Sequence, residues 1–178
     1  GPPPQEIFLQ SSVGQGETFE NHAKPKHVLS IGDPQAPTYL RLKTIALSRL
    51  EGGARVLDHV AGTQWHGAPM ALLQREMLNH SIGLGVFKGV VNDGSPVAAD
   101  LRLETFVDDL SVDLTKNPAV ARLRITALFW DNKSQSLLRQ KAFHFETPIK
   151  AQTPMDIQES FKDLLDQYLK ALGEWMVG

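Results

Sequence analysis

The hydrophobic positions near the end of the chain repeat with the spacing of an amphipathic helix. They are Ile157, Phe161, Leu164, Leu165, Tyr168, Leu169, Leu172, Trp175 and Met176. With about 3.6 residues per turn, these side chains share one wide face. Thr153 can cap the first turn, Pro154 suits the first helical position, and Asp156 stands three residues after Thr153, much like a capping box. The pattern predicts a helix over residues 153–176 that packs against a sheet.

A second helical pattern covers residues 69–82. Its apolar stripe is Met70, Leu73, Met77 and Leu84, widened by Leu72, Leu78 and Ile82. Pro69 suits the first turn, where its missing N–H costs nothing, and Gly83 suits the end.

Apolar runs bounded by turn-forming residues predict strands elsewhere. The predicted strands span residues 26–32, 39–50, 55–61, 85–91, 100–114, 119–130 and 136–149. Alternation is cleanest at Ala121, Leu123, Ile125, Ala127 and Phe129. In the strand over 100–114, Leu101 and Leu103 fall out of phase with Phe106 and Leu110, which predicts a bulge near residues 104–106. The last three strands follow each other closely, which favours an antiparallel meander.

This order of elements predicts an α/β fold with a mixed, largely antiparallel sheet packed by two main amphipathic helices. Residues 26–178 form the single predicted domain. Residues 1–25 are rich in Pro, Gly, Gln and Ser, so we expect a flexible arm that begins with a cloning remnant at Gly1 and Pro2. The predicted structural core contains Trp65, Leu73, Phe106, Phe129, Phe143, Phe161, Leu165 and Trp175.

Composition narrows the classes of function. The chain of 178 residues is 42% hydrophobic and 21% charged with a net charge of −2, as expected of a folded protein without the basic surplus of a nucleic-acid binder. It contains no cysteine, which excludes disulfides, thiolate catalysis and cysteine-based zinc sites within this sequence. No run of 18 apolar residues predicts a membrane-spanning helix.

Candidate chemistry is sparse. None of the six histidines has a partner at the i, i+4 spacing of a helical metal site, and we expect each to be structural or solvated. Trp65 is expected to plug the core, with His66 as a bystander. A hydrolase that uses His66 or His144 with a carboxylate is the less favoured reading. We therefore predict no catalytic residue, cofactor or metal ion.

An acidic group at Asp108, Asp109 and Asp113 has two interpretations. Clustered carboxylates can hold calcium or exchange protons. Alternatively, charges protect an edge strand from aggregation. Asp108 and Asp109 are adjacent on a predicted strand and should point to opposite faces, which favours the second interpretation.

Several segments together resemble the ABC-type transport auxiliary lipoproteins, the PqiC-like family, from about Lys26 to Met176. They are "HVL", "LRLKTIALSRL", a Trp ahead of a Pro-containing helix, "DLRLETFVDDLSVDL", "AVARLRITALFWDNKSQSLLRQKAFHFETPI" and the last helix. Trp65 matches the family's Trp, and Asp100 with Leu101 and Leu103 matches its strand entry. His27 replaces the usual Tyr, and Gln64 replaces an Arg. The resemblance implies a fold related to the TolB N-terminal and anticodon-binding domains.

The resemblance also implies a function. Such proteins are periplasmic lipoproteins, anchored to the outer membrane through an N-terminal Cys that this sequence lacks. They accompany MCE-domain proteins and ABC permeases that move lipids between two membranes. We therefore expect a non-enzymatic accessory subunit that docks such a transporter, with a homo-oligomer as one arrangement. The alternative is a periplasmic carrier that holds a lipid or small ligand in an apolar cleft, with Trp175 and Met176 on its wall.

Overall fold

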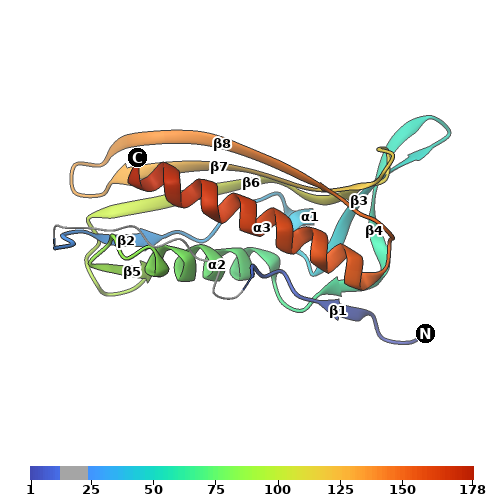
Figure 1. Ribbon diagram of the computed structural model, residues 1–178, viewed down its shortest axis with the longest axis horizontal. Helices are drawn as coiled ribbons and strands as arrows, with labels where there is room; N and C mark the ends of the chain where they lie inside the picture. The colour runs from blue at the N-terminus through green and yellow to red at the C-terminus, as the bar shows by residue number, and fades with distance from the viewer. Residues whose placement is uncertain (13–23) are drawn as a thin grey trace.

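The computed structural model describes residues 1–12 and 24–178. Within these ranges it contains eight strands and three helices (Figure 1). In chain order they are β1 (Gln5–Ile7), β2 (Val28–Ile31), α1 (Thr38–Arg41), β3 (Thr44–Glu51), β4 (Ala54–Trp65), α2 (Pro69–Gly83), β5 (Gly89–Asn92), β6 (Leu101–Asp113), β7 (Val120–Asp131), β8 (Ser136–Pro148) and α3 (Pro154–Val177). The predicted mixed, largely antiparallel sheet with two main helices is confirmed.

Strand β6 is the centre of the sheet. Along one edge it pairs antiparallel with β7 over its whole length, and β7 pairs with β8 to complete the predicted meander. Along the other edge it pairs in parallel with β2 at Leu101–Leu103 and with β3 at Ser111–Asp113. Between these segments Gln35 bridges to Phe106, so the chain from β2 to β3 follows the edge of β6.

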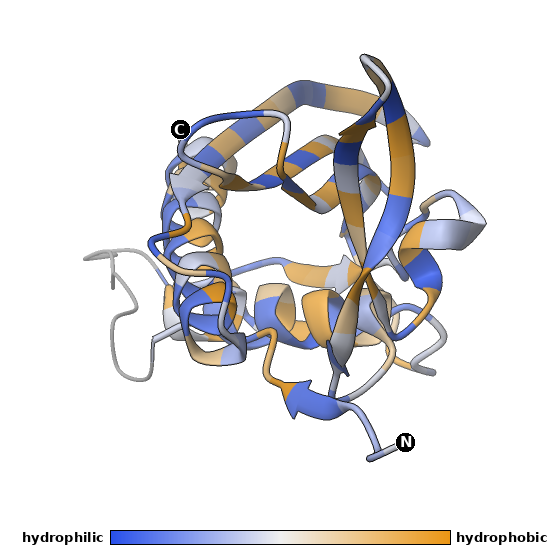
Figure 2. Ribbon diagram, turned by 90° about the vertical axis from the view of Figure 1, so that its right-hand side faces the viewer, coloured by the Kyte–Doolittle hydropathy of each residue, from blue (hydrophilic) through white to orange (hydrophobic). Residues whose placement is uncertain are grey.

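The two long helices cover one face of this sheet. Helix α3 lies along β7 and β8, and α2 lies along β2 and β5 (Figure 1). Hydrophobic and polar residues are interleaved along the long strands (Figure 2). In β7 the alternation directs Ala121, Leu123, Ile125, Ala127 and Phe129 into the core. In the part of the chain that the structure describes, none of the helices combines the length and apolarity needed to cross a bilayer.

Aromatic side chains fill the space between α3 and the sheet. Trp65, 1% exposed, meets Phe161 edge to face with ring centroids 5.0 Å apart. Phe143 packs in the same manner against Tyr168 and Trp175 at 5.5 and 5.8 Å. Of the predicted core residues, Trp65, Leu73, Phe129, Phe143, Phe161 and Leu165 lie in the buried cluster, and Trp175 packs against it.

The prediction that Phe106 belongs to the core was wrong. The bulge in β6 falls between Val107 and Asp109, after Phe106 and not before it. Leu103 and Val107 therefore face the core, while Phe106 points to the opposite side. There it is half-buried in a cavity of about 240 Å³ lined by Gln35, Ala36, Pro37, Val107 and Asp108.

Both ends of α3 are capped by side chains. The Thr153 hydroxyl accepts a hydrogen bond of 3.2 Å from the Asp156 amide, which confirms the predicted N-terminal cap. At the other end, the Arg139 guanidinium on β8 donates to the Trp175 and Met176 carbonyls at 2.6 and 2.8 Å. A cation is favourable at this negative end of the helix dipole. The sequence pattern did not single out Arg139.

Two local predictions were wrong. Residues 38–41 form the short helix α1 where the pattern predicted the start of a strand, and only Leu40 of this turn is buried. Helix α2 continues through Gly83 to a C-cap at Leu84, and Gly85, with φ +73°, adopts the left-handed conformation that ends it.

The expected flexible arm over residues 1–25 is wrong for residues 5–12, which form an N-terminal strap. Strand β1 pairs in parallel with Thr63–Trp65 of β4. Alternation then turns Ile7 and Leu9 into the core. The amides of Ser11 and Ser12 donate to Glu76 on α2 and Asp166 on α3 at 2.6 and 2.8 Å. Residues 13–23 lie outside the described residues.

The strap can be tested by substitution. Leu9 is 1% exposed, so Leu9→Ala should lower the free energy of unfolding by about 2 to 5 kcal/mol through a lost buried side chain and a residual cavity. Urea denaturation measures this change. The exposed neighbour provides the control, because Gln10→Ala should change stability by no more than about 0.5 kcal/mol. Equal, negligible effects of both substitutions would show that the strap is undocked in solution.

Candidate functional site

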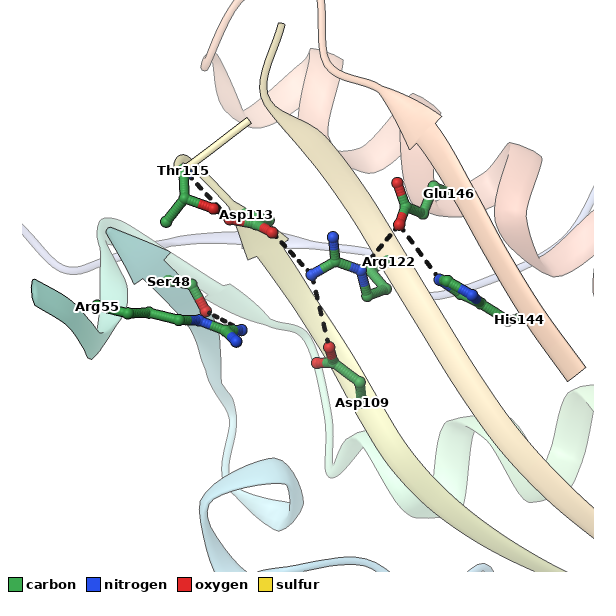
Figure 3. Close-up of polar contacts among 8 residues, drawn as sticks. All are labelled: Ser48, Arg55, Asp109, Asp113, Thr115, Arg122, His144 and Glu146. Atoms are coloured by element: carbon green, nitrogen blue, oxygen red, sulfur yellow. Dashed lines mark hydrogen bonds and ion pairs between the residues drawn. The ribbon is translucent and has the colours of Figure 1, made fainter. Parts of the chain in front are cut away.

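The face of the sheet opposite the long helices carries a charged network centred on Arg122 (Figure 3). Apolar odd-numbered residues of β7 face the helices, so Arg122 projects from the other side. Its guanidinium lies 2.8 Å from Asp113 on β6, 3.1 Å from Glu146 on β8 and 3.9 Å from Asp109 on β6. Glu146 also lies 3.2 Å from the His144 Nε2 atom. Three adjacent strands thus supply one network.

The central ion pair is nearly buried, and hydrogen bonds offset the cost of that burial. The side chains of Arg122 and Asp113 are only 10% and 4% exposed. Burial raises the pKa of Asp113, but hydrogen bonds from the Thr115 hydroxyl and amide and from Arg122 outweigh it and leave that pKa below its usual value. Burial also raises the pKa of Glu146, but the hydrogen bond and charge of Arg122 lower it by more, so this pKa too lies below its usual value. Both carboxylates are therefore held ionised, which favours ion pairing over proton transfer near neutral pH.

Two of the three acidic residues that the sequence analysis grouped together take part in this network. Asp113 and Asp109 face Arg122, whereas Asp108 accepts a hydrogen bond of 3.1 Å from Thr126. The edge-strand explanation is wrong in placing these residues on an edge strand, because β6 lies between β7 on one side and β2 and β3 on the other. Asp108 and Asp109 fall in the interval between the β2 and β3 pairings. Over residues 1–12 and 24–178, no group of three or more acidic or histidine side chains is placed to hold a metal ion.

The two histidines with a proposed chemical role lie apart. His144 is exposed and contacts Glu146, which Arg122 already engages. His66 is half-buried beside the strap, with its ring centroid 4.4 Å from that of Phe8. Its Nδ1 atom is buried and has no hydrogen-bond partner. The structure does not bring His66 to the charged network.

An apolar surface adjoins the charged network at the base of the β3–β4 hairpin. We call Tyr39, Leu42 and Leu57 the hairpin-base patch; Leu42 and Leu57 are 51% and 61% exposed. With Thr44, Ala46, Asp58 and His59 they line a cavity of about 330 Å³. Apolar side chains this exposed are unusual when several gather at one cavity.

The patch and the network are continuous. Ser48 pairs with Leu57 on β4 and with Asp113 on β6, and its hydroxyl accepts a hydrogen bond of 3.0 Å from Arg55 (Figure 3). Burial raises the pKa of Tyr39, and the charge of Asp109 raises it further, while Arg55 lowers it. Tyr39, a member of the patch, therefore lies within electrostatic range of Asp109 in the network and of Arg55 on β4. An apolar centre with a Tyr and a charged rim is the usual anatomy of a protein interface.

The sequence did not identify this site. Arg122, Tyr39, Leu42 and Leu57 were all read as ordinary members of strands. One signal was present, because Arg122 and Arg124 occupy the polar phase of a strand whose other phase is wholly apolar. This pattern indicates a charged face of the sheet, but it does not identify the carboxylates that pair with the two arginines.

Comparison with solved structures establishes the fold. Protein XCC0632 from Xanthomonas campestris, assigned to the DUF330 family, superposes with a TM-score of 0.79 at 16% identity, over 95% of this chain and 93% of that one. A second, uncharacterized protein gives 0.70 at 11% identity, over 97% and 99%. Lipoprotein GNA1162 from Neisseria meningitidis gives only 0.36 at 10% identity, over 85% and 99%, which is too remote to carry an argument. No protein-family model matches the chain, and no curated protein matches its sequence.

The pH dependence of stability tests the Asp113–Arg122 pair. The folded-state pKa of Asp113 is lowered, so its ionised form adds stability that is complete above the unfolded value, about 3.9, and is lost as pH falls through the folded value. Asp113→Asn should therefore lower the free energy of unfolding by roughly 1.5 to 3 kcal/mol at pH 7. The difference in the free energy of unfolding between Asp113→Asn and wild type should become smaller below about pH 4.

Urea denaturation from pH 3 to pH 7 measures the effect. Asp163→Asn, on the exposed side of α3, serves as the control and should leave the profile unchanged. A difference between Asp113→Asn and wild type that stays constant over this range would contradict the ion pair.

Proposed function

We propose that this chain is a non-enzymatic accessory subunit of an intermembrane lipid transport system of the ABC/MCE type. In this proposal it is a lipoprotein that faces the periplasm from the outer membrane. The observation that carries the proposal is the agreement of nearly the whole chain with a DUF330 protein, which has the PqiC-like fold. The same family was suggested independently by sequence segments that span residues 26–176.

The proposed partners are an MCE-domain protein and an ABC permease. The hairpin-base patch and the Arg122 network support a docking role, because together they supply an apolar centre and a charged rim. Leu57 is the natural anchor, since it is the most exposed apolar side chain of the patch. A second copy of the chain is the other proposed occupant, in a homo-oligomer. The lipidated Cys of the proposal is not among the residues of this sequence.

The non-enzymatic part of the proposal draws on the charge state of the network. Asp113 and Glu146 are both engaged by Arg122, and neither has the raised pKa of a general acid. His144 contacts one of these engaged carboxylates. This arrangement suits recognition better than acid–base chemistry.

The alternative, a carrier with cargo between α3 and the sheet, receives less support. Trp175 contacts Phe129 and Phe143 edge to face at 6.0 and 5.8 Å, and Met176 is buried in the core. These side chains occupy the space that cargo would need at that point. Lipid that copurifies with the full-length protein, found by mass spectrometry, would favour the carrier.

Site-specific photo-crosslinking tests the docking proposal. The full-length protein, with its own signal sequence, carries a benzophenone side chain at Leu57 in native membranes. We expect crosslinks to an MCE protein or its permease. The same probe at Leu137, an exposed leucine at the start of β8, should give none.

A charge substitution completes this test. Leu57→Asp should reduce recovery of the transporter about tenfold, because a central apolar anchor contributes more than about 1.4 kcal/mol to binding. Crosslinks only between copies would assign the patch to a homo-oligomer. A lipidated bait that yields no transporter peptide from either position would refute the accessory role.

A further inference from the structure

A polar cavity of about 230 Å³ lies where the N-terminal strap passes α2, away from the hairpin-base patch. It is lined by Leu9, Gln10, His66, Leu72, Arg75, Glu76 and Asn79. We infer that this cavity is a binding site for a small phosphate-bearing anion, either free or as the headgroup of a lipid. The argument rests on how the walls are held and on which side chains have hydrogen bonds to offer.

Three rigid elements build the walls. Leu72, Arg75, Glu76 and Asn79 recur at the spacing that places side chains on one side of a helix. The strap is fixed opposite them, because Leu9 is buried and β1 pairs with β4. His66 joins the two, since its amide donates a hydrogen bond of 2.9 Å to the Ile7 carbonyl and its ring contacts Phe8. A site that is already shaped binds its ligand at a lower entropic cost.

Donor groups dominate the polar lining. Gln10, Arg75 and Asn79 carry N–H donors, and the imidazole of His66 adds another. The Nδ1 atom of His66 is buried beside the cavity and has no hydrogen-bond partner, which costs free energy. The guanidinium of Arg75 matches the planar spacing of two oxygens on a phosphate. An oxyanion is the class of ligand that can accept hydrogen bonds from several of these donors at once.

The carboxylate on the wall is directed to the strap. Glu76 accepts hydrogen bonds from the Ser11 amide at 2.6 Å and from the Ser11 hydroxyl at 3.4 Å, one at each oxygen. Asp166, the next acid, is engaged in the same way by Ser12, at 2.8 and 2.6 Å. Both carboxylates thus hold the strap in place. Burial raises the pKa of Glu76 and the charge of Arg75 lowers it, but no hydrogen bond ties the Arg75 guanidinium to that carboxylate among the described residues.

Size and apolar lining refine the ligand class. Leu72, which is half-buried, supplies an apolar side suited to the carbon chain of a glycerol phosphate. The cavity is too small for acyl chains, so a lipid would insert only its headgroup. A lipid source would rest on the proposed function, whereas phosphate binding itself stands independently of it.

The test uses NMR on the full chain labelled at its histidines. Inorganic phosphate and sn-glycerol 3-phosphate are titrated at constant ionic strength set with chloride, and His66→Gln assigns the signal. We expect a saturable shift of the His66 imidazole signal with either compound. Arg75→Gln should weaken binding about tenfold or more, the loss expected for one charge-assisted hydrogen bond. Arg124→Gln, which removes an exposed charge from β7, should bind like wild type.

Vesicles distinguish the two sources of phosphate. Cosedimentation of wild type, but not Arg75→Gln, with phosphatidylglycerol vesicles and not with phosphatidylcholine vesicles would assign a headgroup. Binding of soluble phosphate without cosedimentation would assign a free anion. The absence of a saturable shift, or equal affinities in Arg75→Gln and wild type, would overturn the site. Crosslinking at Leu57 should be unaffected by Arg75→Gln, so failure of this site and failure of the docking role are separable.

Discussion

The pairing of β6 along both of its edges is the constraint on which the rest of the structure depends. Its long ladder with β7 fixes the meander that α3 covers. Its other edge receives β2, Gln35 and β3 in turn, with hydrogen bonds of 3.0 and 2.7 Å at Gln35. Because side chains alternate across a strand, the single irregularity after Val107 decides which residues of β6 enter the core and which reach the opposite face. The network around Arg122 and the position of Phe106 both follow from it.

Periodicity predicted the two helices and the meander well, because each has a long apolar phase that local sequence displays. The strap was missed for the opposite reason. Ile7 and Leu9 are only two apolar positions in a Pro- and Ser-rich stretch, and their burial depends on a partner edge at Thr63–Trp65 far along the chain. The bulge was expected three residues too early, since hydrophobicity alone could not tell whether Phe106 or Val107 keeps the phase of Leu103.

The candidate site was harder to predict than the fold. Asp113 and Arg122 meet only because the register of β6 on β7 places Ser111 opposite Arg122, and no local pattern reveals that register. Leu42 and Leu57 are residues of the kind that usually fill cores, so their exposure emerges only from the tertiary structure. The β3–β4 hairpin, to which Leu57 belongs, projects from the rest of the sheet (Figure 1). The residues of the candidate site are therefore brought together by tertiary contacts and not by local sequence pattern.

The way β1 joins the sheet also determines how the molecule carries mechanical load. The N-terminus and the C-terminus lie at opposite ends of the long axis (Figure 1). Because β1 runs parallel to β4, tension applied at the N-terminus acts along the strand and shears all of its hydrogen bonds together, where a perpendicular pull would open them one at a time. The buried side chain of Leu9 and the hydrogen bonds of Ser11 and Ser12 to Glu76 and Asp166 follow β1 in the chain and resist the same displacement. A tether attached at this end would therefore pull on the fold in the direction in which its first strand yields least.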